Sequence, residues 1–484
     1  MRLTMSENIF EHILQPIRLR QSDIKNREAL DEFLSDKSRI IYSSSFRRLQ
    51  QKAQVFSLEL NSSVRSRLTH SLEVADTGRI LATKIARKLF KAELITADQA
   101  AELPAVVENA CLMHDIGNPP FGHLGEAAII KWAKENLKDD AAAAGIDFNR
   151  LGCLIDDFYQ FDGNPQGVRI VSRLHCDKDE YGLNLTIPSL LCAVKYARAA
   201  GEKVSDDSDI KKKAGYFQSE IPVVEKAAAK ADWHRDCRYP LTYIMEAADD
   251  ISYCLSDISD GIAKGIITAE QFLKEFQEIW QEKYPSEEIP VTSLQEKKVD
   301  NFNIDVCINV SHQAVDAAAD EFVRRYAEFC SGQTGALITE KMAIGRVLDV
   351  IKQFSRRRIY NSVEAESIEL SGFAVLSGLL QNYFGQLIKM TGVEFADLVA
   401  RKRVKGRVYE QLLFNRVSKR FVRSYAYQLK EWLADDAAVK KYGKDVLEWW
   451  LRVHLIVDHI SGMTDNFALS EYQILEGIKI NNKS

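Results

Sequence analysis

A long segment with helical spacing of its apolar residues most constrains the fold of this chain. Apolar residues recur every three or four positions from Leu68 to Leu89, and a second row on the same segment includes His70 and Val74. A helix that is apolar on two sides is buried, so we expect His70 inside the protein. Only 10 prolines and 24 glycines occur among the 484 residues. The sequence therefore predicts a mainly α fold.

Composition narrows the class of protein. The apolar fraction of 46% and the charged fraction of 27% are those of an ordinary globular protein. The net charge of -5 gives no general argument for binding to nucleic acid. No stretch approaches the roughly 20 apolar residues that span a bilayer. Eight cysteines without a Cys-x-x-Cys spacing indicate reduced thiols. We expect a cytoplasmic protein with no membrane partner.

Two polar stretches, residues 201–213 and 284–300, have the composition of surface loops. The second is the better candidate for a boundary between two parts of the chain. We therefore expect an N-terminal arm at residues 1–40, a catalytic core at 41–283 and a C-terminal helical region at 284–484.

Two histidines and two aspartates form the most informative set of polar residues. The doublet His114-Asp115 ends an apolar run, and the turn-forming residues 117–120 follow it. On a helix, Asp249 shares one face with Tyr253 and Asp257. Burying these carboxylates unpaired in an apolar interior would cost roughly several kcal/mol, so a cation is their natural partner. The alternative is that they lie on a solvated helix face. If these residues converge with His70, they offer nitrogen and oxygen ligands that suit Mg²⁺ or a transition metal.

A second pair lies just beyond the doublet. His123 and Glu126 are three residues apart on a helix that we expect to begin near Gly122, so they share a face. A carboxylate that orients an imidazole is a recurring acid/base arrangement. The alternative for His123 is an interior histidine whose role is only structural.

These motifs resemble a known family. The pattern of His70, His114-Asp115 and Asp249 is similar to that of the HD-domain phosphohydrolases, which have a helical core. Longer segments resemble the bacterial dGTPases (deoxyguanosinetriphosphate triphosphohydrolases). These segments are residues 47–56, 67–71, 114–123, 163–167, 246–253 and 461–465. The resemblance extends from about residue 39 to 470, and it implies an HD-domain core with an additional C-terminal helical region.

The resemblance implies metal-dependent hydrolysis of dGTP to deoxyguanosine and inorganic triphosphate, by attack of metal-activated water at the α-phosphorus. The metal would be Mg²⁺ or Mn²⁺, which can lower the pKa of bound water from about 15.7 to about 7. The resemblance assigns four metal ligands, His70, His114, Asp115 and Asp249, and two catalytic residues, His123 and Glu126. Whether His123 protonates the leaving oxygen or aligns the water stays open.

The resemblance also implies a set of substrate contacts. Gln54 would contact the 3′-hydroxyl, Val55 would crowd the 2′ position and Tyr253 would stack beneath the sugar, with Asp257 in the same pocket. The residues that would bind triphosphate and sugar are Asn164, Lys195, Tyr196 and Lys213. Lys213 has an alternative as the end of a solvated loop. Arg47 and Arg48 would either contact phosphate or form structural ion pairs.

The family further implies a homo-oligomer, a hexamer in the dGTPases, with the C-terminal region as an interface. Some members bind single-stranded DNA, for which basic residues interleaved with aromatics are suited. Residues 401–407 and 416–423 have that character. The alternative is an amphipathic helix with a solvated basic side.

Three other functions compete with dGTP hydrolysis. A triphosphohydrolase of broader dNTP specificity would use the same metal site. A cyclic-nucleotide or alarmone phosphodiesterase is disfavoured by the segments around Gln54 and Asn164. A nucleotide- or DNA-binding regulator with a degenerate HD site is disfavoured because all four metal-binding candidates and the His123/Glu126 pair are present.

Overall fold

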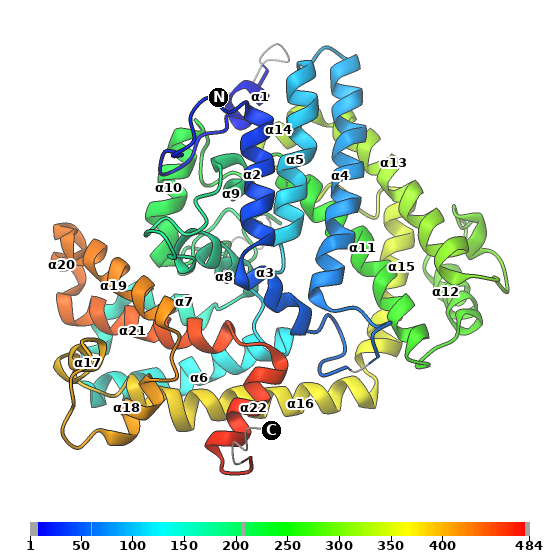
Figure 1. Cartoon of the computed structure of the whole chain (residues 1–484). Coiled ribbons are helices and arrows are strands. Elements are labelled where there is room, and N and C mark those ends of the chain that lie inside the picture. Colours follow the sequence, from blue (N-terminus) through cyan, green and yellow to red (C-terminus); the bar gives the residue numbers. More distant parts are fainter. Residues whose placement is uncertain (1–7, 60, 205–208, 480–484) are drawn as a thin grey trace.

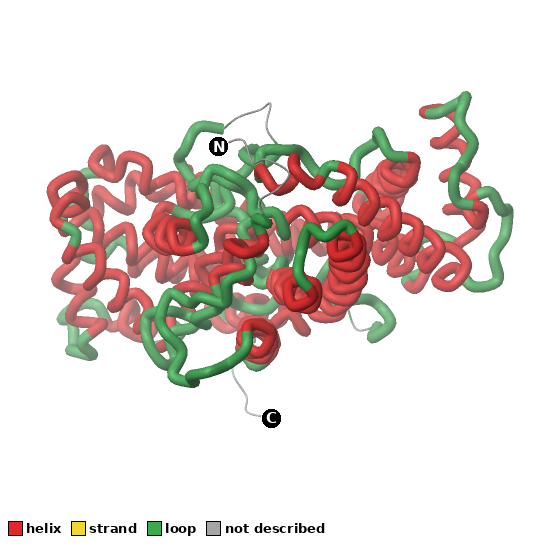
Figure 2. Tube along the Cα trace, turned by 90° about the horizontal axis from the view of Figure 1, so that it is seen from above, coloured by secondary structure: helices red, strands yellow, loops and turns green. Residues whose placement is uncertain are grey.

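The structure is a computed structural model that describes residues 8–59, 61–204 and 209–479. Helices form its regular structure, and these residues contain no β-strand, only isolated bridges (Figure 2). The predicted mainly α fold is confirmed.

The helices of the first half are α1 (Phe10–Ile13), α2 (Ala29–Ile41), α3 (Ser44–Arg48), α4 (Arg67–Lys91), α5 (Ala97–Met113), α6 (Gly122–Ala143), α7 (Asp156–Tyr159), α8 (Gly163–Arg169), α9 (Ile187–Cys192), α10 (Ile221–Lys230) and α11 (Thr242–Ala263). Those of the second half are α12 (Ala269–Lys283), α13 (Asn309–Arg324), α14 (Tyr326–Ser331), α15 (Ala343–Ser355), α16 (Val363–Gly378), α17 (Gly392–Val399), α18 (Val408–Phe414), α19 (Lys419–Ala434), α20 (Asp436–Tyr442), α21 (Lys444–Ser461) and α22 (Asp465–Leu475). Short 3₁₀ or π segments are η1 (Leu49–Gln51), η2 (Phe148–Ile155), η3 (Ile170–Leu174), η4 (Gln218–Glu220), η5 (Thr292–Leu294), η6 (Asn303–Ile308), η7 (Arg356–Tyr360), η8 (Leu379–Tyr383) and η9 (Phe384–Leu387).

The helices form two groups that meet at the lower end of α4. In the first group α4 packs against α5, α11 and α13, and α2 covers α5 (Figure 1). In the second group α16 packs against α6 and α22, while α19 packs against α21. Figure 1 shows α6, α16 and α21 crossing beneath the upright helices α2, α4 and α5.

Helix α4 forms where the apolar spacing predicts it. Its first turn is closed by a capping box, in which the side chains of Ser66 and Thr69 each accept the backbone N–H of the other residue. His70 is fully buried, as expected. Leu72 differs from the expectation, because it is 49% exposed at the edge of an open groove between α4 and α13.

Gly78 sets the close approach of α4 to α5. A Cβ at this position would lie 2.5 Å from the Sγ of Cys111 on α5, which is shorter than any normal contact. The glycine therefore lets the two backbones pack tightly. This contact fixes the distance between the helices that carry His70 and His114.

The predicted three-part division of the chain stays a prediction. The segment 284–300 is irregular apart from η5, in line with its expected loop character. One connected hydrophobic core contains Phe33 from the predicted arm, Ile129 from the predicted catalytic core and Val457 from the C-terminal region.

Candidate functional site

Three of the predicted metal-binding residues converge from three helices. His70 lies in the first turns of α4, His114 directly follows α5, and Asp249 lies on α11. Their ligand atoms all lie within 4.8 Å of one another. The Nε2 atoms of His70 and His114 are 3.4 and 3.5 Å from the Oδ1 of Asp249. One small cation can reach all three atoms at once.

The hydrogen bonding of the two imidazoles fits a cation. The carbonyl of Cys111 can only accept, so the Nδ1 of His114, at 2.7 Å, donates to it, which leaves the Nε2 lone pair directed at Asp249. That Nε2 has no hydrogen-bond partner in the described structure. The same holds for both ring nitrogens of the fully buried His70. Buried polar atoms without partners are costly, so an additional group is expected here.

Charges around Asp249 favour its ionised form. Burial raises the pKa of this carboxyl, but the nearby His114, His70 and Lys195 together hold it well below its usual range. The Nζ of Lys195 lies 3.6 Å from the Oδ2 of Asp249. The site therefore presents an anionic oxygen beside two imidazole nitrogens.

Asp115 lies beside this group with both oxygens engaged. Its Oδ2 accepts a hydrogen bond from Arg67 at 2.7 Å, and its Oδ1 accepts one from the side chain of Asn118. The Nε2 of His114 is 3.6 Å from Oδ2. Burial raises the pKa of Asp115, but Arg67 and the histidines lower it to about 2. Asp115 is ionised, and its role as a metal ligand stays a prediction. Arg67 and Asn118 were not singled out from the sequence.

The turn after the doublet is held against α8. A Cβ at Gly117 would lie 2.0 Å from the carbonyl oxygen of Gly163, so only glycine permits this contact. Helix α6 then begins at Gly122 after Phe121, which has a positive φ of 60°. The expected start of this helix is confirmed.

His123 and Glu126 contact each other as their spacing predicts. The Nδ1 of His123 lies 3.2 Å from the Oε2 of Glu126, whose Oε1 accepts the backbone N–H of Gly163 at 2.8 Å. Glu126 is thereby fixed on both oxygens. The His123 side chain is 89% exposed, which leaves its Nε2 open to a ligand. The hydrogen bond with Glu126 raises the pKa of His123.

Tyr253 and Asp257 meet at a residue that the sequence did not indicate. The hydroxyl of Tyr360, at the end of η7, is hydrogen-bonded to Tyr253 and to the Oδ2 of Asp257. Burial raises the pKa of Asp257 to about 7. Its Oδ1 has no partner among the described residues. Tyr360 lies in an arginine-rich segment far along the chain, and no local signal marks it.

The segment with Gln54 and Val55 is held by the C-terminal helix. The backbone N–H of Ala53 donates to the Oδ2 of Asp465 at 3.0 Å, and the N–H of Phe121 donates to its Oδ1 at 3.1 Å. Gln54 and Val55 are half-buried, and the Oε1 of Gln54 is unpartnered in the described structure. Asp465 was noticed only as part of a motif, and its contacts were not predicted.

The four candidate phosphate-binding residues fall into two groups. Lys195 faces Asp249, and Tyr196 beside it is buried. Asn164 and Lys213 both bind Asp162, at 2.6 and 2.7 Å. The Lys213 side chain is 50% exposed and paired with this carboxylate.

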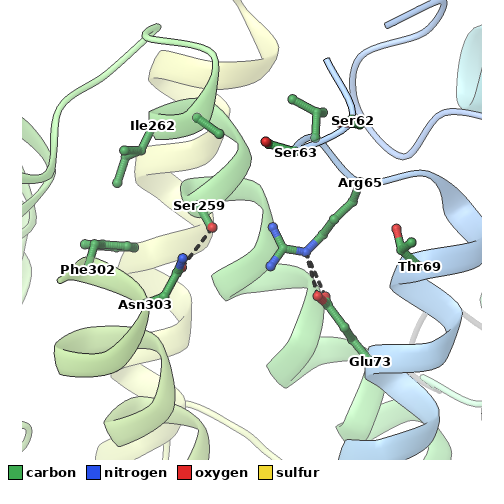
Figure 3. Close-up of a pocket in the computed structure, with 11 residues that line it drawn as sticks. Ser62, Ser63, Arg65, Thr69, Glu73, Ser259, Ile262, Phe302 and Asn303 are labelled. Carbon is green, nitrogen blue, oxygen red and sulfur yellow. Dashed lines mark hydrogen bonds and ion pairs between the residues drawn. The ribbon is translucent and has the colours of Figure 1, made fainter. Parts of the chain in front are cut away.

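A cavity of about 490 Å³ opens beside the start of α4, and none of the predicted site residues lines it (Figure 3). Arg65 in its wall binds Glu73 at 2.8 Å and Asp260 at 2.6 Å. Asn303 and Ser259 form a hydrogen bond on the opposite wall. Asp260 lies one helical turn after Asp257, so Arg65 links the start of α4 to the part of α11 that bears Asp257.

Comparisons with known proteins identify the family. The HD-domain family model matches residues 67–189, which contain His70, His114 and Asp115. The deoxyguanosinetriphosphate triphosphohydrolase of Enterobacter sp. (strain 638) is 34% identical over 95% of this chain and 96% of its own length. The chain belongs to the bacterial dGTPase family. The protein of that name from Klebsiella pneumoniae is also 34% identical, over 94% of this chain and 95% of its own length.

In this dGTPase-family chain the HD match covers only part of the candidate site. Asp249, Tyr253 and Lys195 lie after residue 189, and Gln54 and Val55 lie before residue 67. The similarity to the two dGTPases covers all of them. Within the described part of the chain, none of the helices is both long and apolar enough to cross a bilayer.

Proposed function

We propose that the protein hydrolyses dGTP to deoxyguanosine and inorganic triphosphate, with a divalent cation held by His70, His114, Asp115 and Asp249. The observation that carries the proposal is the convergence of His70, His114 and Asp249 in a chain 34% identical to dGTP triphosphohydrolases over 95% of its length. The unpartnered ring nitrogens support a cation at this point.

The cation, Mg²⁺ or Mn²⁺, supplies Lewis acidity, which makes a water nucleophilic at neutral pH and withdraws charge from the phosphate. Other residues of the protein orient the side chains that would bind this cation. The Cys111 carbonyl fixes the tautomer of His114, while Arg67 and Asn118 hold the carboxylate of Asp115 in place. These contacts keep the ligand atoms in position before the substrate arrives.

His123 is proposed as the general acid for the leaving 5′ oxygen. The leaving group is an alkoxide, and a positioned acid typically contributes about 10²–10⁴-fold to such a step. Glu126 orients the imidazole and raises its pKa, so that a larger share of His123 carries a proton at neutral pH. The open Nε2 is the atom from which the proton would leave.

The sugar is proposed to lie between Val55 and Tyr253. In this arrangement Gln54 and Asp257 would bind the 3′-hydroxyl; the unpartnered oxygens of both side chains support that role. Val55 offers no hydrogen bond to a 2′-hydroxyl, whose desolvation would be uncompensated. The pocket would thereby favour deoxyribonucleotides.

The phosphates are proposed to contact Lys195, Tyr196, Asn164 and Lys213. Lys195 supports this role because it lies 3.6 Å from Asp249, and the charges of Asp249 and Glu246 raise its pKa against the effect of burial. It is therefore cationic next to the cluster. Lys213 would exchange its contact with Asp162 for a phosphate oxygen.

The test is product analysis with each dNTP and rNTP in the presence of Mg²⁺ or Mn²⁺. Release of inorganic triphosphate from dGTP supports the proposal. Comparable rates with all four dNTPs would favour a broader triphosphohydrolase, and nucleotide binding without turnover would favour a regulator. Release of pyrophosphate or orthophosphate alone would contradict the reaction.

We also propose a cytoplasmic homo-hexamer that binds single-stranded DNA. Exposed apolar side chains on α18, Val408, Tyr409 and Leu412, support an interface in the C-terminal region. The free state of all eight cysteines supports a reducing compartment. Molar mass in solution tests the assembly, and DNA titration tests the partner.

A further inference from the structure

Two arginines from distant parts of the chain share one hydroxyl group. Arg48 of α3 and Arg420 of α19 both place Nη1 near the Oγ of Ser44, at 3.4 and 2.6 Å. Because both nitrogen atoms contact the same Oγ, the distance between them is at most the sum of these two distances, about 6 Å. Arg48 also donates to the Oγ of Ser45 at 2.8 Å.

The positive charge at this point has little compensation. In the described structure no carboxylate lies within 4.0 Å of the Arg48 guanidinium, whose partners are hydroxyl groups. The carboxylate of Asp177 accepts from the Nε of Arg420 at 3.0 Å, but its side chain is 64% exposed. Arg47 and Arg423 lie exposed at the edge. We call Arg47, Arg48, Arg420 and Arg423 the arginine cluster.

The positive charge of these arginines also lowers the pKa values of neighbouring groups. Burial and the charges of Arg420 and Arg47 lower the pKa of Arg48 to about 10. Burial, Arg420 and Arg48 lower the pKa of His175 to about 3, so this histidine is neutral. Its Nε2 contacts Ser45 at 2.9 Å and its Nδ1 lies 3.4 Å from Arg420. A neutral imidazole adds no further charge to the cluster.

The arginine cluster is separate from the candidate phosphate contacts of the metal site. Lys195 is directed at Asp249 and Lys213 at Asp162, whereas Arg48 and Arg420 contact Ser44 and Ser45 on α3. The cationic charges that lower the pKa of His123 are those of Arg67 and Lys213. Among the described residues Arg47 and Arg48 form no ion pair; they bind a backbone carbonyl and hydroxyl groups.

We propose that the arginine cluster is a second anion site, which binds a phosphate group between α3 and α19. Paired guanidinium groups match the oxygens of a phosphate with two parallel hydrogen bonds. A bound phosphate would replace Ser44 as the shared acceptor and would neutralise the repulsion between Arg48 and Arg420. The phosphate can belong to a small polyphosphate anion or to the backbone of a single-stranded polynucleotide.

The test measures binding of inorganic tripolyphosphate and of a short DNA single strand to the full chain, with a metal chelator present. The variants are Arg420→Gln and Arg48→Gln, and Arg87→Gln on α4 is the matched control, because it removes the same charge from an exposed position elsewhere. Lys195 and Lys213 are intact in all of them, so a difference reports on the arginine cluster. We expect at least about a tenfold loss of affinity in both cluster variants and none in the control.

Asp177→Asn removes the carboxylate that pairs with Arg420 in the described part of the chain and should tighten binding. Loss of tripolyphosphate binding alone assigns a small anion, and loss of DNA binding alone assigns a polynucleotide backbone. Thermal unfolding adds an independent readout: inorganic tripolyphosphate should raise the Tm of the wild type more than that of Arg48→Gln. Equal affinities in wild type and both cluster variants, or no binding to the wild type, would overturn the proposal.

Discussion

The phenol of Tyr360 donates a hydrogen bond to the carboxylate of Asp257, although 103 residues separate them. The same oxygen is bonded to the hydroxyl of Tyr253, and the two tyrosine rings stack at 6.4 Å. Tyr360 thereby ties the end of η7 to the face of α11 where the sugar is proposed to bind.

Tyr360→Phe removes this hydroxyl and keeps the ring. The Oδ2 of Asp257 then loses its partner in a buried place, at a cost of about 1–3 kcal/mol. We expect kcat/KM for dGTP to fall by about tenfold, mostly through KM, because the sugar contacts lose their alignment. Steady-state kinetics check this. A fall in Tm with unchanged kcat and KM would show that Tyr360 only stabilises the fold.

Asp249→Asn should remove most of the bound metal. The substitution takes the negative charge from the centre of the cluster and keeps its size. Metal content after gel filtration, measured by elemental analysis, checks this, and circular dichroism confirms the fold. Asp115→Ala should also lower metal content and turnover. Stoichiometric metal in Asp115→Ala would remove Asp115 from the ligand set and leave three protein ligands.

His123→Ala should lower kcat by about 10²–10⁴-fold, since it removes the proposed acid. Metal content and nucleotide affinity should stay near those of the wild type, because His123 is outside the cluster. Glu126→Gln should have a smaller effect on kcat, because an amide can still accept from His123. Near-normal kcat in His123→Ala would contradict the catalytic role.

Val55→Ala should admit GTP measurably but incompletely. The change opens space of about two methyl groups at the 2′ position, and such changes in apolar pockets alter selectivity by about 1–3 kcal/mol. The ratio of kcat/KM for dGTP and GTP is the measurement. Gln54→Ala serves as the comparison, since both nucleotides carry the 3′-hydroxyl and should lose activity alike. An unchanged ratio in Val55→Ala would place the sugar selection elsewhere.

Much of the site was predictable because its residues lie on regular helices. The spacing of the apolar residues placed His70 inside α4, and the three-residue spacing of His123 and Glu126 predicted their contact. The sequence did not indicate Tyr360 or the contacts of Asp465. Both act through contacts over more than 100 residues, and such pairs leave no local periodicity.

Acid pH should destabilise the fold through buried neutral histidines. Burial and the charge of Arg416 lower the pKa of His459 from 6.5 to about 4. The unfolded chain therefore binds a proton as pH falls below about 6.5, while the folded protein does not do so until about 4. The contribution of His459 to the free energy of unfolding is complete above about pH 6.5, the pKa in the unfolded chain. It decreases as pH falls, by about 2 kcal/mol at about pH 5.

Urea unfolding at about pH 7 and about pH 5 checks this effect. In His459→Gln the drop in unfolding free energy between the two pH values should be smaller by about 2 kcal/mol, whatever the absolute stability of the variant. An identical drop in both proteins would show that His459 titrates alike in the folded and unfolded chains.

The clamp formed by Asp465 has a consequence for the order in which the protein is made. Its two oxygens hold Ala53 and Phe121, and 412 residues separate Ala53 from it. A ribosome that adds about 5–20 residues per second needs about 20–80 s to cover that interval. Once residue 114 has been added, the nascent chain carries His70 and His114, but the backbone of the segment with Gln54 still lacks its anchor. The backbone around Gln54 can therefore reach its final position only after α22 has been synthesised and has docked.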